Sequence, residues 1–319
     1  ALFKIIMSLK EKGIAILFVS HKLNEVFEIS ERFTILRNGE KIITGNTSEL
    51  DDKKFTYYMT GREFEDIRFE PENIGEEPLL DVENLGLKGC FHNVSFSLRK
   101  GEILGITGLL GSGRTELALS LFGINPADQG KIRIKGREVV IDSVMAAMKH
   151  NIGYVPEDRL SEGLFLLQSI GDNIVISELD GISSKRGIIN KAKRKSEIDK
   201  WVKELGIATN NPENACNTLS GGNQQKVVLA KWLSRNLDIL ILNGPTVGVD
   251  IGAKHDIYAI LQNLAHKGMG IIIISDDLPE ILRNCNRVII MKKGTVDAEL
   301  DPKEINESQL LEYMMEGNE

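Results

Sequence analysis

The stretch Gly108-Leu-Leu-Gly-Ser-Gly-Arg-Thr115 fits the pattern G-x-x-x-x-G-[K/R]-[S/T], with Arg114 at the position where lysine is usual. A short apolar run, Glu102-Ile-Leu-Gly-Ile-Thr107, precedes it and predicts a strand. The run Glu116-Leu-Ala-Leu-Ser-Leu-Phe122 follows it and predicts a helix. Strand, glycine loop and helix form the context in which such a loop binds phosphate. The alternative is a glycine-rich turn that only connects a strand to a helix.

The residue types in this loop suit a phosphate ligand. Glycines let successive backbone N–H groups turn inward onto phosphate oxygens, and a helix N-terminus adds partial positive charge. Arg114 would neutralise the outer phosphates through its planar guanidinium, and the hydroxyl of Thr115 would bind Mg²⁺. The predicted binding residues of the loop are Gly108, Gly111, Ser112, Gly113, Arg114 and Thr115.

Composition narrows the class of protein. The chain has 319 residues, which favours two domains, and its formal net charge of −7 argues against a nucleic-acid partner. Its three cysteines, Cys90, Cys216 and Cys285, form no C-x-x-C pair, which is typical of reduced cytosolic thiols. No apolar run approaches the roughly 18 residues that span a bilayer, and no signal peptide is evident. Any membrane role is therefore expected to be peripheral.

Residues 1–60 repeat the end of the chain at an offset of 255 positions. Identical residues in this register include Leu9 and Leu264, Gly13 and Gly268, Ser20 and Ser275, Arg32 and Arg287, and Gly39 and Gly294. We therefore predict that residues 1–60 are the C-terminal remnant of a first copy of the unit, cut inside a helix over Ala1–Lys12. Chance similarity between two α/β segments is the alternative. Within this part, Ile14-Ala-Ile-Leu-Phe-Val19 predicts a fully buried strand.

A second, complete unit is predicted to follow. Residues 61–77 are acidic and lack apolar periodicity, so we predict a linker there, with the second unit spanning residues 78–319. Residues 164–222 have a predominantly helical pattern. The apolar runs Asp238–Leu242 and Gly270–Ile274 are typical of strands in a buried parallel sheet.

A second motif, Leu219-Ser-Gly-Gly-Asn-Gln-Gln-Lys226, stands ahead of a predicted helix over Val227–Arg235. A serine followed by two glycines at a helix start exposes N–H donors and a hydroxyl, which suits an anion, although an ordinary N-cap has a similar composition. With both motifs present, the chain resembles the ATP-binding cassette (ABC) transporter ATPases. In this resemblance Leu219 to Gly222 match the family signature, Gly108 to Thr115 match the Walker A loop, and Asp238 to Leu242 match the Walker B strand.

The extended signature, the stretch Val155-Pro-Glu-Asp-Arg159 and Arg114 narrow this resemblance further. Together they look like the second cassette of the tandem ATPases of monosaccharide importers, of the ribose, galactose and xylose type. The resemblance covers the whole chain. It implies an α/β fold, a P-loop NTPase cassette with a mostly parallel sheet core, an N-terminal antiparallel β subdomain and a helical subdomain. It also implies ATP and Mg²⁺ as ligands.

The family packs two cassettes head to tail and holds ATP between the P-loop of one and the signature of the other. The resemblance therefore implies residues that serve nucleotide held by a missing first cassette or a second copy of the ATPase: Leu219, Ser220, Gly221, Gly222 and Gln224. His21 would be the switch histidine of that first cassette. Glu157 would sense Mg²⁺ and the membrane subunit, at a position where most of the superfamily has Gln, and Asp250 would couple the two sites.

The chain departs from the family at three catalytic positions. The Walker B strand normally ends Asp-Glu-Pro-Thr, whereas this chain has Asn243-Gly244-Pro245-Thr246. Asn243 lacks the charge that helps to hold Mg²⁺, and Gly244 lacks the carboxylate that orients water, a loss of roughly 10²- to 10⁴-fold in rate. Asp276 stands at the switch position and would repel a γ-phosphate. We predict a site that binds nucleotide and hydrolyses it poorly; a substitution without physiological meaning is the alternative.

Other candidate residues carry weaker signals. Family members often stack adenine on an aromatic side chain upstream of the P-loop, and Phe91 is the nearby candidate, although a core position is favoured. Lys191–Lys195 is predicted to be a solvated basic helix face. The histidines that lack metal-ligand spacing, and are predicted to be surface or loop residues, are His92, His150, His255 and His266.

Three functions compete. The leading hypothesis is an energy-coupling ATPase subunit, peripheral at the cytoplasmic side of the cell membrane, that acts with permease subunits and indirectly with a sugar-binding protein. A soluble ABC protein that acts on nucleic acid or the ribosome would predict a basic face or a charged helical insertion, and the short acidic linker argues against it. The third is a nucleotide-binding regulatory module without turnover.

Overall fold

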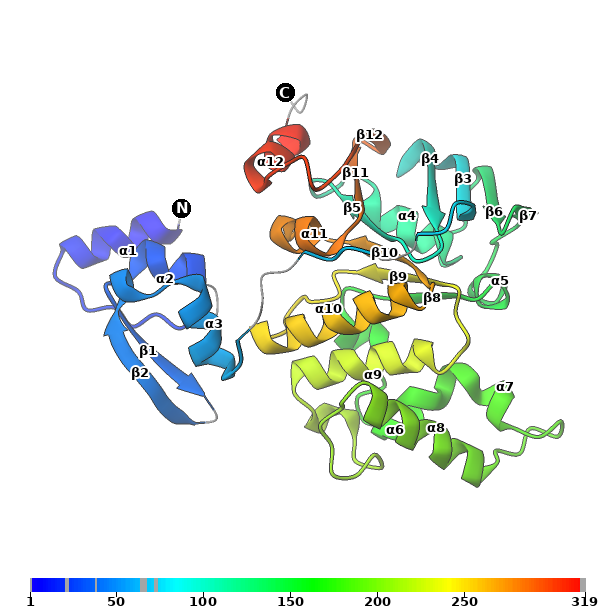
Figure 1. Cartoon of the computed structure of the whole chain (residues 1–319), viewed down its shortest axis with the longest axis horizontal. Helices are drawn as coiled ribbons and strands as arrows, with labels where there is room; N and C mark the ends of the chain where they lie inside the picture. The colour runs from blue at the N-terminus through cyan, green and yellow to red at the C-terminus, as the bar shows by residue number, and fades with distance from the viewer. Residues whose placement is uncertain (1, 21–22, 38, 64–67, 72–73, 316–319) are drawn as a thin grey trace. The chain divides into compact units, whose positions relative to one another are not determined.

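The computed structural model describes residues 2–20, 23–37, 39–63, 68–71 and 74–315. The chain divides into two compact units (Figure 1). The smaller unit comprises Ala1–Ile67 with Asp250–Asp256, and the larger comprises Arg68–Val249 with Ile257–Glu319.

One sheet of the larger unit has six strands in the order β12-β11-β5-β10-β9-β8. All neighbouring pairs are parallel except β11 and β12, which form an antiparallel pair. The strands are β5 (Ile103–Thr107), β8 (Ile152–Val155), β9 (Ile239–Asn243), β10 (Gly270–Ile274), β11 (Arg287–Lys292) and β12 (Thr295–Leu300). Every residue of β5, β9 and β10 is buried, as expected for apolar strands covered on both faces. The predicted parallel core is confirmed, and β10 brings the carboxyl ends of β5 and β9 to one edge of the sheet.

A second sheet of the larger unit has four antiparallel strands in the order β4-β3-β6-β7. Its strands are β3 (Pro78–Leu87), β4 (Phe91–Arg99), β6 (Gln129–Ile134) and β7 (Arg137–Val139). Leu80, Val94 and Leu98 are almost fully buried and alternate with exposed residues such as Ser95, which is the pattern of a sheet with one covered face. The predicted antiparallel β subdomain is confirmed.

Helices cover the parallel sheet and form a separate helical region. The helices are α4 (Arg114–Leu121), α5 (Val144–Lys149), α6 (Ile170–Val175), α7 (Leu179–Ile182), α8 (Lys191–Glu204), α9 (Gly221–Leu233), α10 (Ile251–His266), α11 (Leu278–Asn284) and α12 (Glu307–Met315), with the short turns η2 (Arg159–Gly163), η3 (Ile176–Glu178) and η4 (Cys216–Thr218). In Figure 1, α6 and α8 lie at the end of the larger unit that is remote from β3 and β4. The expected helical subdomain is confirmed, with α6, α7 and α8 as its helices between the glycine loop and α9.

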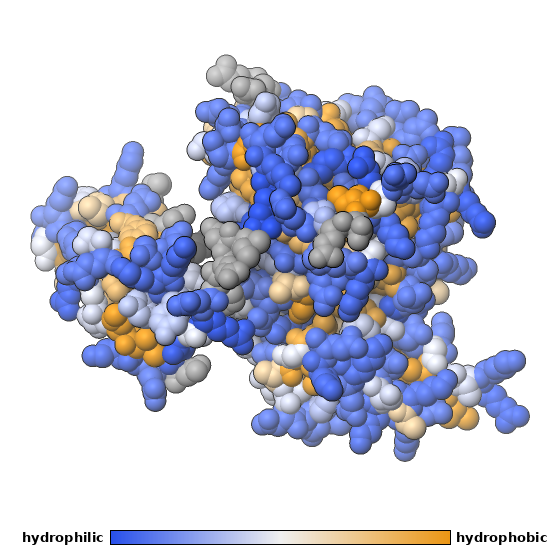
Figure 2. Space-filling view, in the orientation of Figure 1, coloured by the Kyte–Doolittle hydropathy of each residue, from blue (hydrophilic) through white to orange (hydrophobic). Residues whose placement is uncertain are grey.

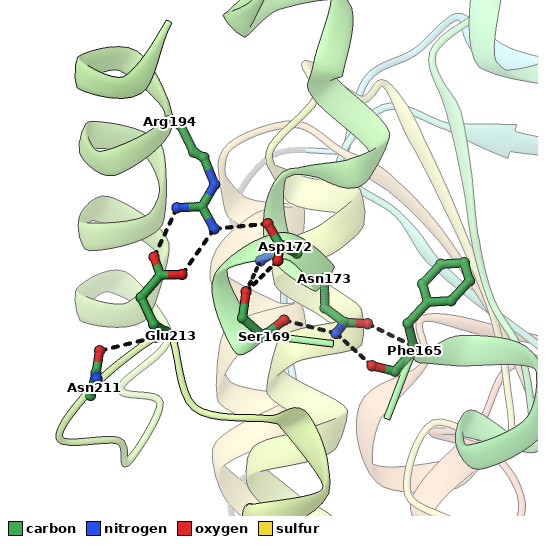
Figure 3. A network of polar contacts seen from close by, with 7 residues as sticks. All are labelled: Phe165, Ser169, Asp172, Asn173, Arg194, Asn211 and Glu213. Atoms are coloured by element: carbon green, nitrogen blue, oxygen red, sulfur yellow. Dashed lines mark hydrogen bonds and ion pairs between the residues drawn. The ribbon is translucent and has the colours of Figure 1, made fainter. Parts of the chain in front are cut away.

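A polar network holds the helical region together (Figure 3). Arg194 on α8 donates to Asp172 on α6 and to Glu213 in the following loop, each at 2.8 Å. The buried Asn173 receives a hydrogen bond from the Phe165 backbone N–H at 2.8 Å and returns one to the Phe165 carbonyl at 3.0 Å. The predicted solvated basic face over Lys191–Lys195 is therefore only partly right, because Arg194 is 21% exposed and joins α8 to its neighbours.

Lys231 joins α9 to the turn η2. Its ammonium donates to the carbonyl of Gly163 at 2.6 Å in a buried position. Burial lowers the pKa of Lys231 to about 8, because removing an ammonium from water disfavours its charged form.

This burial predicts a pH dependence of stability. Between about pH 8 and the ordinary lysine pKa the unfolded chain binds a proton that the folded chain does not, so the free energy of unfolding rises with pH, by up to about 3 kcal/mol. Urea unfolding at pH values from 7.5 to 10 measures this effect. The free energy of unfolding should rise more steeply with pH in the wild type than in Lys231→Met. The exposed Lys193→Met on α8 is the control and should keep the wild-type slope. Equal slopes in wild type and Lys231→Met would contradict the prediction.

The smaller unit has a small core of its own. It contains α1 (Leu2–Glu11), α2 (Leu23–Ile29), β1 (Arg32–Arg37), β2 (Glu40–Asn46), η1 (Thr47–Glu49) and α3 (Asp52–Thr60). β1 and β2 pair antiparallel, and Ile35, Leu50 and Phe55 form the buried cluster between the hairpin and α3. The bounds of α2, β1 and α3 match those of α11, β11 and α12 at the same offset of 255 positions as the sequence repeat.

The prediction of a fully buried strand over Ile14–Val19 is wrong. These residues form no strand in the structure, and Leu17 and Val19 are 94% and 89% exposed. The matching strand in the repeat, β10, is buried because β5 and β9 pair with both of its edges. No described strand pairs with residues 14–19, so their apolar side chains lie in solvent. Such apolar positions interrupt a largely hydrophilic surface on both units (Figure 2).

The segment predicted as an acidic linker is partly packed. Phe69 is 5% exposed, its N–H donates to the Arg283 carbonyl at 3.0 Å, and its ring lies 5.1 Å from that of His266. Residues 68–71 therefore belong with the larger unit. Among the residues that the structure describes, every helix is too short or too polar to cross a lipid bilayer.

Candidate functional site

The glycine loop follows directly on the central sheet. β5 ends at Thr107, and α4 begins at Arg114 with Gly113 as its N-cap residue. Gly111 and Gly113 have φ angles of +80° and +93°, in the region that residues with a side chain rarely adopt. The loop therefore bends back in front of the N-terminus of α4, which is the arrangement that binds anions.

Close packing leaves no room for a side chain at two glycines of this loop, whereas Gly111 has open space around it. A Cβ on Gly108 would lie 2.4 Å from the Met291 carbonyl oxygen and 2.6 Å from Ser112 Oγ. A Cβ on Gly113 would lie 2.9 Å from the Cys90 carbonyl oxygen. Gly108 and Gly113 are thus required by close packing, and Gly111 and Gly113 by their positive φ angles.

Ser112 has an unsatisfied polar atom. Its side chain is 4% exposed, and its Oγ has no hydrogen-bond partner within the described ranges. A buried hydroxyl without a partner costs about 1–3 kcal/mol, and a phosphate oxygen would remove that cost. The glycine geometry and this hydroxyl together fit a bound phosphate group.

Arg114 lies beside the position matched to the family's switch residue. Its Nη1 donates to the Ser275 carbonyl at 3.2 Å, and its Nη2 lies 3.8 Å from Asp276 Oδ2. The Arg114 side chain is 14% exposed, whereas that of Asp276 is 78% exposed. The carboxylate therefore competes with any phosphate for the guanidinium of Arg114.

A cavity of about 500 Å³ opens next to the loop. Its lining includes Thr115 on α4, Tyr154 on β8, Glu157 after β8, and Asn243 at the end of β9. Burial raises the pKa of Tyr154 to about 12, although a hydrogen bond with Asn243 acts in the opposite direction. The cavity thus presents a hydroxyl, an amide and the carboxyl group of Glu157, all uncharged or acidic ligands of the kind that Mg²⁺ takes together with phosphate oxygens.

The backbone conformation and the close neighbours of Gly244 suit a residue without a side chain. Its φ is +55°, and a Cβ would lie 2.8 Å from Val247 Cγ2 and 3.1 Å from Glu157 Cγ. Its N–H donates to the Ile274 carbonyl at 2.8 Å, which fixes the turn after β9 against β10. A carboxylate side chain at this position would require Val247 and Glu157 to move.

The second motif forms the start of α9, which begins at Gly221, six residues earlier than the predicted helix over Val227–Arg235. Ser220 is the exposed N-cap residue, and its side chain caps no backbone N–H of the helix but accepts a hydrogen bond from Asn223 Nδ2 at 3.0 Å. The first N–H groups of α9, from Gly221 and Gly222, are therefore not capped by the serine. Gln224 is buried, at 8% exposed, one turn further along. This end of α9 is a second place that favours an anion.

Comparison with known proteins decides the family. Residues 91–247 match the family described as ABC transporter. A ribose import ATP-binding protein RbsA of Bacillus subtilis (strain 168) is 40% identical over 311 residues, covering 97% of this chain and 63% of that protein. The same-named protein of Geobacillus kaustophilus is 41% identical over 320 residues, covering 100% of this chain and 64% of that protein. A putative ribose/galactose/methyl galactoside import ATP-binding protein of Agrobacterium fabrum is 40% identical over 315 residues, covering 98% and 62%.

The chain belongs to the ABC transporter family. It spans less than two thirds of the length of these ABC relatives. Solved ABC cassettes share the fold: a nucleotide-free cassette has a TM-score of 0.63 at 22% identity, covering 75% of this chain and 95% of that one. A cassette in its ADP conformation has a TM-score of 0.64 at 22% identity, and the match covers 74% of this chain and 98% of that one.

The remaining residues expected from the ABC resemblance lie in different settings. His21 lies outside the described residues. Asp250 is exposed, and its carboxylate accepts from the Ala253 N–H at 3.0 Å at the start of α10. Phe91 is 3% exposed, so its ring belongs to the core and is not available to stack on a base, as the favoured interpretation held.

Sequence reasoning missed two residues of this ABC cassette that lie close to its motifs. Tyr154 lines the cavity, although a tyrosine in an apolar strand carries no distinctive pattern. Arg159 belongs in the sequence to the stretch Val155–Arg159 and has no predicted role of its own, yet it contacts the turn after β9. Its position inside a charged run after a buried strand was the only available signal.

Proposed function

We propose that this chain is an ATP-binding, energy-coupling subunit of an ABC importer for simple sugars. The observation that carries the proposal is the glycine loop, in which close packing excludes a side chain at Gly108 and Gly113 and the buried hydroxyl of Ser112 has no hydrogen-bond partner within the described ranges. Relatives that are about 40% identical to this chain are named ribose import ATP-binding proteins, which supports a simple sugar as the imported substrate. ATP with Mg²⁺ is the proposed ligand, with Thr115 and Asn243 on the Mg²⁺ side.

The two motifs of the larger unit would serve two different nucleotides. The loop Gly108–Thr115 would hold one ATP, while Leu219 to Gly222, with Gln224, would complete a site whose P-loop belongs to a first cassette or to a second copy of the ATPase. The repeat at 255 positions supports a tandem arrangement, with residues 1–60 as the end of the first cassette, His21 as its switch histidine and Asp250 in the coupling loop. The proposed partners are permease subunits at the cytoplasmic face and, through them, a sugar-binding protein.

The site on the glycine loop is proposed to bind ATP and to hydrolyse it slowly. Mg²⁺ bound with the nucleotide would offset phosphate charge. Asn243 offers Mg²⁺ a neutral amide in place of a carboxylate, and Gly244 offers no base for water. Asp276 places negative charge within 3.8 Å of Arg114. Turnover would then depend on the other composite site, to which this chain contributes the signature.

Calorimetric titration with MgATP tests the binding step. We expect saturable binding that weakens by roughly tenfold in Thr115→Val, because a hydroxyl ligand of the metal is lost. EDTA, which removes Mg²⁺, should weaken binding by the wild type at least as much, and it should have a smaller effect on Thr115→Val, which has already lost one ligand of the metal. Thr44→Val, on the exposed face of β2, is the matched control. No binding by the wild type would refute the proposal.

A nucleotide-binding regulatory module without turnover is the second candidate. The left-handed backbone of Gly244 and its crowding by Val247 favour it, because the turn is built around a residue without a side chain. The two candidates differ in phosphate release when a second signature motif completes the site: slow release supports the ATPase subunit, and none supports the regulatory module.

A further inference from the structure

Arg159 occupies a position that the nucleotide motifs do not account for. It is the first residue of η2, two positions after Glu157, which lines the cavity. Its Nη1 donates to the Val247 carbonyl at 2.7 Å, and its Nη2 donates to the Gly248 carbonyl at 3.1 Å. One guanidinium thus holds two successive carbonyls of the turn that follows Asn243 and Gly244.

Glycines make room for this guanidinium on two sides. A Cβ on Gly221, in the signature, would lie 2.8 Å from Arg159 Nη2 and 3.0 Å from the Gly248 carbonyl oxygen. A Cβ on Gly248, whose φ is +65°, would lie 3.4 Å from Arg159 Nη1. The start of α9, the turn after β9 and the segment after β8 therefore meet at one side chain.

The backbone that carries Arg159 is held firmly. Asp158 accepts from the N–H groups of Leu160 and Ser161 at 2.9 and 3.3 Å, and from Ser161 Oγ at 2.7 Å. These bonds hold the pKa of Asp158 below its usual range, chiefly through the hydroxyl of Ser161. Glu157 directly precedes this turn and Arg159 lies within it, so a short hydrogen-bonded stretch of backbone joins the two residues.

We propose that Arg159 is a positioning residue that couples the nucleotide cavity to the signature motif within one cassette. When Mg²⁺ and phosphate fill the cavity beside Glu157, the guanidinium transmits the shift to the Gly248 carbonyl and to the start of α9 at Gly221. The nucleotide on this cassette thereby sets the geometry that the signature offers to the nucleotide of the other cassette. This inference rests on the proposed function for the identity of its ligand. The role of Arg159 in holding the turn after β9 and the start of α9 does not depend on nucleotide.

Amide hydrogen exchange on the nucleotide-free chain tests the structural part. Arg159→Lys keeps the charge but cannot hold two carbonyls with a rigid fork. We expect exchange at the hydrogen-bonded N–H groups of Val247, Val249 and Gln224 to become roughly tenfold faster in Arg159→Lys, the effect of losing one charge-assisted hydrogen bond. Arg137→Lys, on exposed strand β7, is the control and should leave these rates unchanged. Unchanged rates in Arg159→Lys would overturn the positioning role.

The same measurement with saturating MgATP tests the coupling, with calorimetry in parallel. In the wild type, MgATP should slow exchange at residues 219–224. Arg159 also lines the cavity, so Arg159→Lys and Arg159→Gln are compared with the wild type at MgATP concentrations that calorimetry shows to be saturating for each protein. At saturation both variants should lose the slowing at residues 219–224. If nucleotide binds and the variants still show the wild-type slowing, or the wild type shows none, the coupling is refuted. If no nucleotide binds, the proposed function fails, and the nucleotide-free exchange alone decides the role of Arg159.

Discussion

Replacing Arg114 by alanine is expected to weaken MgATP binding by roughly 100-fold, the loss of one to two charge-assisted hydrogen bonds to phosphate. Arg114 is the one cation of the glycine loop, and its guanidinium is largely shielded from solvent. Its present partners are a backbone carbonyl and the distant carboxylate of Asp276, which leaves donors for phosphate. Calorimetry or fluorescent-nucleotide titration of the two proteins would measure the change.

A companion variant, Asp276→Asn, is expected to change the affinity for MgATP in the opposite direction. Removing its charge should tighten MgATP binding by about threefold to tenfold, because a carboxylate near the phosphates repels them and competes for Arg114. Arg114→Lys should stay within about tenfold of the wild type, since an ammonium supplies the charge as a point donor. Wild-type affinity in Arg114→Ala would contradict a phosphate-binding role for the loop, and weaker binding in Asp276→Asn would contradict the competition.

Placing acidic residues at the two proposed Walker B positions, Asn243 and Gly244, is expected to raise ATP hydrolysis at this site by roughly 10²- to 10⁴-fold, the usual contribution of a general base. Asn243→Asp supplies a charge toward Mg²⁺, and Gly244→Glu supplies the carboxylate. The structure shows that Gly244→Glu alone is strained, because its Cβ would meet Val247 Cγ2 at 2.8 Å at a φ of +55°. The variant to make is therefore Asn243→Asp, Gly244→Glu and Val247→Ala together.

This repair must be measured where the site is complete. Phosphate release should be followed in a two-cassette protein in which another signature faces the glycine loop, with Ser→Ala in that signature to report the background. Val247→Ala alone is the matched control and should leave the rate unchanged. A triple variant that folds, binds MgATP and still shows the background rate would show that Asn243 and Gly244 do not limit turnover.

Local patterns in the sequence were sufficient to predict many of the strands, helices and loops of this protein. The glycine loop and the apolar strands β5, β9 and β10 lie where spacing and periodicity predicted them, and a helix follows the second motif, although it begins six residues earlier than predicted. These features depend on interactions within a few residues, such as helix capping and the burial of continuous apolar runs. The repeat at 255 positions was also visible, because it is a property of residue identity alone.

Tertiary structure decided the features that depend on residues far apart in the chain. Arg114 lies beside Asp276, and Arg159 lies between the turn at Gly248 and the signature at Gly221, because separate strands end at the same edge of the sheet. The same holds for Ile14–Val19: its apolar pattern predicted burial, but a strand is buried only when neighbouring strands cover its edges, and the described residues provide none. The sequence by itself therefore determined the glycine loop, the main elements of the larger unit and the repeat of this ABC chain. Only the packing of distant segments decided which side chains meet at its site.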